Sequence, residues 1–420
     1  MKVAFWLKNN GKTLNLDEFQ YGNPGIGGTQ FEIGMVSTLL QQMYENINVS
    51  LYTDSLQVKS NIIDVVYVES FDVMFKKIIN NNEVLIFTQS DVDKLFYQKL
   101  CTSNCVAIAW VHNFLLYSDY LNLAKISNIK KIVFVGQQLY DHYIDTPLRN
   151  KAVVIFNCIP KVNVEFDNKK NNNVAYVGAL QRQKGFHVLA KAWKRVLKDC
   201  PDAKLYVFGG GLYGSVVKQS KYQKYCNEFL LDKQGKLLPS VYYMGTVNLD
   251  KEGYYNKIKV GVANPTGKTE TFCLSAVEFQ SHKIPVVTYD GNGLLDTVDD
   301  KKTGFRIKNS KRCSEAIIKL LKDNELNYKM SEYAKDFVDK RFTKDEIIPQ
   351  WYRLITKELC VDLSGDFFSK KYWLYDFKWL RYLNYKIKKK LRISNGFSVQ
   401  YIRMSLVYFI KKLIYNTTDK

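Results

Sequence analysis

Two glutamates in the second half of the chain are spaced for chemistry on a polar ligand. Glu270 stands in a Gly/Pro-punctuated loop, and Glu278 follows inside a run with helical apolar periodicity. This pattern predicts a helix that begins just after Glu270, with Thr271 or Thr269 as its N-cap. The first amides of a helix have no acceptor within it and favour an anion. A carboxylate for hydroxyl groups beside amides for phosphate fits a sugar nucleotide.

The spacing Glu270-x7-Glu278, followed by Pro285-Val286-Val287, resembles the E-x7-E signature of retaining glycosyltransferases with the GT-B fold, the group called family 4. The family usually has Phe-Gly-Leu where this chain has Phe272-Cys273-Leu274, and Gly before the proline where this chain has Lys283-Ile284. Both differences are compatible with the resemblance, because backbone amides bind the phosphate. The alternative interpretation is an amphipathic helix with two solvated glutamates.

A basic loop follows the predicted strand at Val174–Val177. The family generally has Gly-Arg-Leu-x(3)-Lys-Gly here, and this chain matches it over 178–185 except that Ala179 replaces the arginine. Cations at the carboxyl end of a strand suit a diphosphate leaving group. The resemblance implies this role for Lys184, and Arg182 is a candidate for the missing guanidinium. A solvated basic loop is the alternative.

The first half of the chain contributes a glycine loop. Gly25-Ile26-Gly27-Gly28-Thr29 lies between the first predicted strand and a helix that extends to about Met43, so its amides can approach a phosphate. The spacing is not that of a dinucleotide-binding fingerprint. It resembles the Gly-Gly loop of the family, which implies that Gly27 and Gly28 face the donor diphosphate.

Two further positions follow strands. His112 stands at the carboxyl end of a predicted strand, where open α/β sheets bind ligands. The resemblance implies that it contacts the donor sugar, and a structural histidine that closes the loop with Asn113 is the alternative. The run Val241–Val247 resembles the strand and turn that lie under the nucleotide base in the family, and the resemblance places Val247 against that base.

No cofactor or catalytic metal is expected. Asp91-Val92-Asp93 has the D-x-D pattern of a metal site, but a predicted helix follows at once, so we interpret both acids as residues of its first turn. The eight cysteines have no zinc or redox spacing and suit reduced thiols in a cytosolic protein. Val3–Leu7 is too short for a signal sequence, and no apolar run is long enough to span a membrane.

The elements that would position these residues alternate in the βα rhythm of a parallel sheet. The resemblance implies the α/β GT-B fold, in which two Rossmann-like domains face each other across a cleft. The expected domains are 1–161 on the acceptor side, 162–343 for the nucleotide sugar, a helix at 344–360 that crosses back, and a basic aromatic helical extension at 361–420. The strands expected in the first half are Val3–Leu7, Val49–Tyr52, Val65–Val68, Val84–Thr88, Val106–Val111, Lys131–Val135 and Ala152–Phe156.

The extension carries much of the charge. The chain has a net charge of +20, and residues 366–420 hold 13 Lys/Arg and 3 Asp/Glu. Between Tyr372 and Arg392 apolar side chains, Trp373 and Phe377 among them, recur on one helical face and cations gather on another. This pattern suits an anionic membrane surface, so one hypothesis is peripheral contact of 366–420 with the cytoplasmic membrane face. Packing on the protein's own body is the alternative, and nucleic acid is not expected as a partner.

The resemblance thus implies an enzyme: a retaining, metal-independent glycosyltransferase. It would move a sugar from a nucleoside-diphosphate sugar, with UDP-hexose favoured, to a glycan or lipid-linked acceptor, as in surface polysaccharide or lipopolysaccharide assembly. The alternatives are a sugar-nucleotide epimerase or phosphorylase of the same fold, or a catalytically decayed membrane-surface binding module. The expected catalytic residues are His112, Lys184 and Glu270, and the expected donor-binding residues are Gly27, Gly28, Arg182, Val247, Phe272, Cys273, Leu274 and Glu278.

Overall fold

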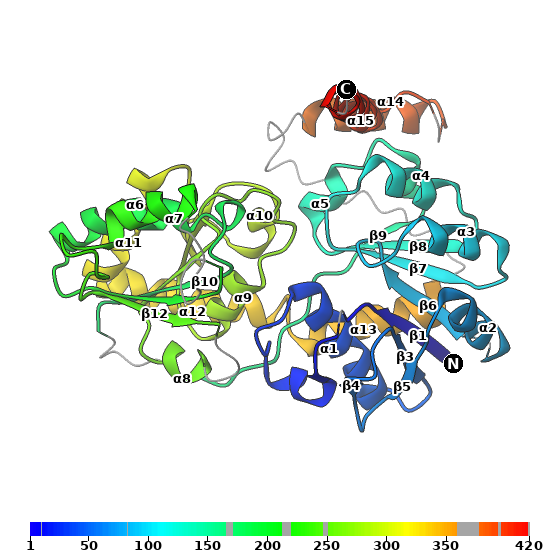
Figure 1. Ribbon diagram of the computed structural model, residues 1–420, viewed down its shortest axis with the longest axis horizontal. Coiled ribbons are helices and arrows are strands. Elements are labelled where there is room, and N and C mark those ends of the chain that lie inside the picture. Colours follow the sequence, from blue (N-terminus) through cyan, green and yellow to red (C-terminus); the bar gives the residue numbers. More distant parts are fainter. Residues whose placement is uncertain are drawn as a thin grey trace. The chain divides into compact units, whose positions relative to one another are not determined.

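The chain forms two compact units in the computed structural model shown in Figure 1. Unit 1 comprises Met1–Phe19, Thr29–Phe156 and Ile347–Lys420, and unit 2 comprises Gln20–Gly28 and Asn157–Glu346. The structure describes residues 1–9, 11–81, 83–164, 171–211, 220–246, 251–358, 378–393 and 396–418.

Unit 1 is built on a parallel seven-stranded sheet in the order β5-β3-β1-β6-β7-β8-β9. Its central strands β1, β6 and β7 are largely apolar and almost entirely buried, as expected for a parallel sheet that helices cover. All seven strands predicted in this half are present. They are β1 (Lys2–Leu7), β3 (Asn48–Thr53), β5 (Asp64–Tyr67), β6 (Glu83–Thr88), β7 (Ala107–Val111), β8 (Ile129–Phe134) and β9 (Ala152–Val154), beside a small pair of β2 (Leu14–Asn15) and β4 (Val58–Lys59).

The helices of unit 1 follow its strands in the expected rhythm. Asp93 caps α3, since its Oδ1 accepts from the Phe96 amide at 2.9 Å. Asp91 was predicted in the first turn, and this was wrong: a turn in which its amide donates to the Thr88 carbonyl at 3.1 Å holds it before the helix. The helices are α1 (Gly28–Met43), α2 (Phe71–Asn81), α3 (Lys94–Thr102), α4 (Tyr117–Lys125) and α5 (Gln137–Asp141).

Unit 2 has a parallel six-stranded sheet in the order β12-β11-β10-β13-β14-β15. Alternate residues of β10 belong to two different hydrophobic cores: Val174 and Tyr176 lie in one core, and Ala175 lies in the other. Both faces of the sheet are therefore covered. The strands are β10 (Asn173–Val177), β11 (Lys204–Phe208), β12 (Val241–Gly245), β13 (Val260–Ala263), β14 (Val286–Tyr289) and β15 (Gly304–Ile307). The helices are α6 (Phe186–Asp199), α7 (Lys221–Leu230), α8 (Lys251–Tyr255), α9 (Leu274–Ser281), α10 (Leu294–Thr297), α11 (Ser310–Lys322) and α12 (Asn324–Asp339).

The chain then returns to unit 1 through α13 (Lys344–Arg353), which continues as a π-helical turn over Leu354–Glu358. Trp351 is fully buried and meets Trp110 of β7 edge-to-face, with 4.6 Å between the ring centroids. Tyr352 stacks on Tyr44 at 3.8 Å. These aromatic contacts fix the returning helix on unit 1.

Two helices end the chain, α14 (Lys378–Lys390) and α15 (Val399–Thr418). The sequence left two interpretations of the basic face of this region, contact with a membrane surface and packing on the protein's own body. Lys378, Arg381 and Lys388 are buried in the protein, so this part of the basic face packs on the body. Trp373 and Phe377, which were predicted on the apolar face, lie outside the described residues. Among the residues that are described, no helix combines the length and the apolar character needed to cross a membrane.

Candidate active site

The loops at the carboxyl ends of β10, β11 and β13 line one pocket of unit 2, with a volume of about 620 Å³. Ligands bind at this end of open parallel sheets, and the volume is in the range of small-molecule sites. The glycine loop that precedes α1 also lines this pocket, and it belongs to unit 2. The lining residues are Asn23, Gly25–Gly28, Tyr176–Ala179, Gln181, Lys184, Phe208–Gly211, Thr246, Asn264, Glu270, Phe272–Ser275 and Glu278.

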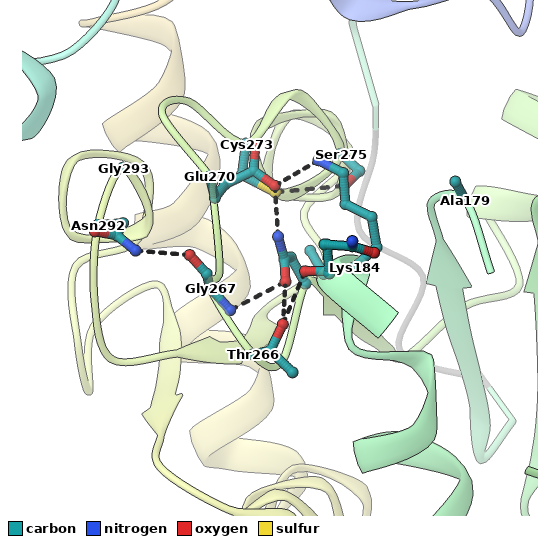
Figure 2. A network of polar contacts seen from close by, with 12 residues as sticks. Ala179, Lys184, Thr266, Gly267, Glu270, Cys273, Ser275, Asn292 and Gly293 are labelled. Carbon is teal, nitrogen blue, oxygen red and sulfur yellow. Dashed lines mark hydrogen bonds and ion pairs between the residues drawn. The ribbon is translucent and has the colours of Figure 1, made fainter. Parts of the chain in front are cut away.

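An ion pair joins two of these loops, as Figure 2 shows. Lys184 Nζ lies 2.8 Å from Glu270 Oε2, and Asn264 Nδ2 donates to the same oxygen at 2.6 Å. The Glu270 side chain is 8% exposed and that of Lys184 is 40% exposed, so the ammonium can still donate to a ligand in the pocket. Burial lowers the pKa of Lys184, but the Glu270 carboxylate outweighs this, and the pKa is raised above its usual range. Lys184 is therefore a cation at physiological pH.

Lys184 is held by the close approach of its loop to the loop before α9. Gly185 has a φ of +76°, and a Cβ built on it would lie 2.7 Å from the Thr266 backbone nitrogen. Thr266 Oγ1 donates to the Gln183 carbonyl at 2.9 Å, and Tyr176 Oη donates to the Lys184 carbonyl at 2.8 Å. A left-handed glycine without a side chain is thus needed next to Lys184.

The loop that carries Glu270 has an unusual backbone. Asn264 and Thr269 have φ values of 37° and 58°, and a positive φ is rare for a β-branched residue such as threonine. The loop after β14 supports it: the Gly293 amide donates to the Glu270 carbonyl at 2.9 Å, and Asn292 Nδ2 donates to the Gly267 carbonyl at 2.8 Å. Backbone strain of this kind clusters at ligand sites, where the surrounding contacts maintain it.

Helix α9 begins later than the sequence predicted. Its N-cap is Cys273, which makes no capping side-chain hydrogen bond, so the prediction of Thr271 or Thr269 as N-cap was wrong. Thr269 has a positive φ of 58°, whereas an N-cap residue is extended, as Cys273 is, and the helix begins at Leu274. Leu274 and Ser275, the first two residues of α9, line the pocket, and the partial positive charge of a helix N-terminus favours an anion there.

Cys273 occupies the position where the family usually has glycine. Its thiol is buried and lies 3.5 Å from Ser275 Oγ. Burial, and after it the Glu270 carboxylate, raise the pKa of Cys273 to about 12. The thiol is therefore neutral and adds no negative charge where an anion would bind.

Most of the predicted site residues share this pocket. Arg182 is exposed and is not among the lining residues, whereas Ala179, at the family's arginine position, lines the pocket. Val247 lies outside the described residues, next to the lining residue Thr246. The predicted residues that line the pocket are Gly27, Gly28, Lys184, Glu270, Phe272, Cys273, Leu274 and Glu278.

His112 belongs to unit 1, where it directly follows β7. It is 5% exposed and its ring lies 4.6 Å from that of Trp110. Burial lowers its pKa to about 3, so the imidazole is neutral at physiological pH. A contact from His112 to a ligand would be a hydrogen bond and not an ion pair.

The structure adds residues that the sequence analysis did not assign to the site. Asn264 orients Glu270, and its position directly after the β13 strand was a usable signal. The glycine turn after β11 closes on the turn after β10: a Cβ on Gly209 would lie 2.0 Å from the Gly178 carbonyl oxygen. Only a glycine there lets the two turns line one pocket.

The predicted absence of a catalytic metal is not decided by these contacts. Within the described part of the chain, no group of three or more His, Cys, Asp or Glu residues is placed to hold a metal ion. Metal independence stays a prediction for experiment.

The comparisons with known proteins agree with this geometry. Residues 161–337, which include Lys184, Glu270 and Glu278, match the family described as Glycosyl transferases group 1. One relative is the poly(glycerol-phosphate) alpha-glucosyltransferase of Bacillus subtilis, 30% identical over 55% of this chain and 31% of its own length. Another is the capsular polysaccharide biosynthesis glycosyltransferase CapM of Staphylococcus aureus, 27% identical over 47% of this chain and 50% of its own length. The matched region thus spans half or less of these two relatives.

A solved structure shows the same fold. The crystal structure of Anabaena Alr3699/HepE in complex with UDP and glucose aligns with a TM-score of 0.61 and 14% identity, over 85% of this chain and all of the other. The predicted fold class is confirmed: the chain has the GT-B α/β architecture of two Rossmann-like units with parallel sheets, followed by a helical C-terminal region.

Proposed function

We propose that the chain transfers a sugar from a nucleoside-diphosphate sugar, with UDP-hexose as the first candidate, to a glycan or lipid-linked acceptor. The configuration at the anomeric carbon would be retained, as in the E-x7-E transferases of family 4 that the sequence resembles. No metal would be required. The observation that carries the proposal is the Lys184–Glu270 pair beside the N-terminus of α9 in one pocket.

The reaction breaks the bond between the anomeric carbon and a diphosphate oxygen, and forms a bond from that carbon to the acceptor oxygen. The barrier is the charge that develops on the departing diphosphate. Lys184 has three donors, so it can bind the diphosphate while one N–H stays on Glu270. The amides of α9 and of the Gly27-Gly28 loop would add dipoles aimed at the same charge, and such preorganised donors are effective catalysts. The diphosphate would accept the acceptor's proton as it leaves.

The carboxylates would bind the rest of the donor. Glu270, held by Lys184 and Asn264, would accept hydrogen bonds from the sugar hydroxyls. Glu278 lies within α9 and is half-buried, with Tyr255 Oη 3.4 Å from its Oε2. It would accept hydrogen bonds from the ribose hydroxyls. His112 would donate to the sugar as a neutral imidazole. Arg182 stays a candidate for the diphosphate and Val247 for the base.

The relatives support the substrate classes. The Bacillus subtilis protein is named for glucosyl transfer to poly(glycerol-phosphate) and the Staphylococcus aureus protein for capsular polysaccharide biosynthesis. The Anabaena structure holds UDP and glucose. A uridine donor and a surface-glycan acceptor are therefore the first pair to test.

The experiment is a screen of the purified chain against UDP- and GDP-hexoses in EDTA. It measures ligand-induced stabilisation, release of nucleoside diphosphate, and the fate of the sugar with and without a poly(glycerol-phosphate) acceptor. Stabilisation by a UDP-hexose and an acceptor-linked sugar are expected. A free epimerised sugar nucleotide, or a sugar phosphate formed with inorganic phosphate, would replace the proposal with an epimerase or a phosphorylase. Absence of binding to every donor would overturn it.

A further inference from the structure

Helix α14 packs on unit 1 with its basic side chains inward. Lys378 Nζ lies 3.0 Å from Asp141 Oδ2, and neither side chain is exposed. Lys388 Nζ donates to the Asp145 carbonyl at 3.0 Å, and Arg381 Nη2 donates to Gln400 of α15 at 2.9 Å. These three cations form one stripe of the helix, and each of them makes a hydrogen bond or ion pair within the protein.

The opposite stripe of α14 is apolar and faces outward. Trp379, Leu383, Ile387 and Leu391 follow one another at intervals of four residues, which places them on one side of a helix. They are 39%, 51%, 48% and 60% exposed. An amphipathic helix normally buries this face, so the reversed orientation needs a partner for it.

Helix α15 continues the same surface. Its first turns are docked, because Gln400 and Met404 are buried and the Tyr401 hydroxyl lies 3.0 Å from that of Tyr117, at the start of α4. From Leu406 to Ile410, five successive large apolar residues are between 46% and 56% exposed. Five successive residues occupy every side of a helix, so this segment is exposed all round.

We propose that this surface inserts into the headgroup region of an anionic lipid bilayer. We call it the C-terminal apolar surface and define it as Trp379, Leu383, Ile387, Leu391, Ile393, Phe397, Tyr401, Ile402 and Leu406–Ile410.

The charges around the surface fit this partner. Residues 378–418 contain ten Lys/Arg and no Asp/Glu. The exposed cations Lys386, Lys389, Lys390, Arg392 and Arg403 lie beside the apolar stripe and not within the buried one. Apolar and aromatic side chains bordered by cations are typical of helices that lie in the interface of anionic membranes. A second copy of the chain is disfavoured as the partner, because it would bring the same positive charge to the contact.

This arrangement changes the mode of contact that the sequence suggested. The buried stripe of cations holds α14 on the body, and apolar insertion, assisted by the exposed cations, would hold the protein on the bilayer. Contact of this kind would bring the chain to lipid-linked acceptors. The proposal does not depend on glycosyl transfer, because vesicle binding is measured without donor or acceptor.

The test is cosedimentation of the full chain with vesicles of phosphatidylcholine, with and without phosphatidylglycerol. The altered variant is Leu406→Ser/Phe409→Ser/Ile410→Ser. Its matched control removes three exposed apolar side chains elsewhere on unit 1, Leu56→Ser/Ile79→Ser/Leu95→Ser, which are 80%, 36% and 49% exposed. The partition coefficient is expected to fall at least about 30-fold in the altered variant and to change less than about 2-fold in the control.

A second variant tests the cations. Neutralising Lys386, Lys389 and Arg392 with glutamine should weaken binding to phosphatidylglycerol vesicles by about 5-fold per residue, and added salt should weaken the wild type in the same way. Equal vesicle binding by the wild type and the Leu406→Ser/Phe409→Ser/Ile410→Ser variant would overturn the proposal. So would a wild type that binds no vesicle but self-associates through these residues in sedimentation velocity. Loss of donor binding with intact vesicle binding would affect only the proposed function.

Discussion

Replacing Gly185 by alanine should separate the two loops that hold the Lys184–Glu270 pair. An alanine with the observed φ of +76° is strained by about 1–2 kcal/mol. Its Cβ would also lie 2.7 Å from the Thr266 nitrogen and 3.1 Å from Pro265 Cδ, and overpacking of this kind costs about 1–3 kcal/mol. The total loss in the free energy of unfolding is therefore about 2–5 kcal/mol.

Gly235→Ala is the matched control within the same unit. Gly235 has a φ of +78° and nothing within 4 Å of a Cβ built on it, so only the backbone strain remains. The two variants should differ by about 1–3 kcal/mol, the part that belongs to the contact between the loops. The shift that Gly235→Ala causes also identifies which unfolding transition belongs to unit 2.

The assay is scanning calorimetry of the full chain together with donor turnover. Gly185→Ala should lower turnover by about 100-fold, since a misplacement of a catalytic group such as Lys184 by about 1 Å can have this effect. Gly235→Ala should leave turnover unchanged. Equal destabilisation by both variants with unchanged turnover would refute the argument that the Gly185 contact with Thr266 positions Lys184.

Further predictions concern the thiols and the C-terminal helices. At pH 8 in the native protein, an alkylating reagent should modify exposed Cys101 at least about 10-fold faster than Cys273, whose buried thiol stays protonated below its pKa of about 12; peptide mapping measures both rates. Lys378→Met leaves the buried Asp141 carboxylate without its cation and should weaken the docking of α14 by about 3–5 kcal/mol. Hydrogen exchange should show this as lost protection in α14, and Lys386→Met, at an exposed position, should leave protection unchanged.

Much of the fold followed from local pattern. The strands of unit 1 are apolar runs separated by helical periodicity, so their existence and order could be predicted and their ends were placed within about two residues. The start of α9 could not be predicted, because Thr269 has a left-handed backbone that does not suit an N-cap, and Cys273 takes that position. A threonine at position 269 does not by itself predict a left-handed conformation, because the neighbouring loops maintain that conformation.

The site shows the same division. Residue types at strand ends indicated Lys184 and Glu270, and the structure joins them in one ion pair. The role of Asn264 depends on a hydrogen bond across a turn, and that of Gly209 on the approach of another loop. Both are contacts in space, which one sequence does not show.

The C-terminal helices were the least predictable part. Periodicity separated an apolar from a basic face, and experience with soluble helices places the apolar face inward. The orientation is decided instead by Asp141 and Asp145 on unit 1, whose contacts with Lys378, Lys388 and Asn384 turn the basic side of α14 toward the body. A charged partner more than 200 residues away in the sequence thus decides which face of the helix is buried.

Turnover of UDP-glucose by the full chain in EDTA tests the central claim most directly, with Lys184→Met and Lys191→Met compared beside the wild type. Lys191 lies on the exposed side of α6 and serves as the control for loss of a lysine charge. We predict that EDTA leaves wild-type turnover unchanged, that Lys191→Met behaves as wild type, and that Lys184→Met lowers kcat by about 100- to 1,000-fold. Turnover that EDTA abolishes and Mg²⁺ or Mn²⁺ restores, or a Lys184→Met variant as active as the control, would contradict the account.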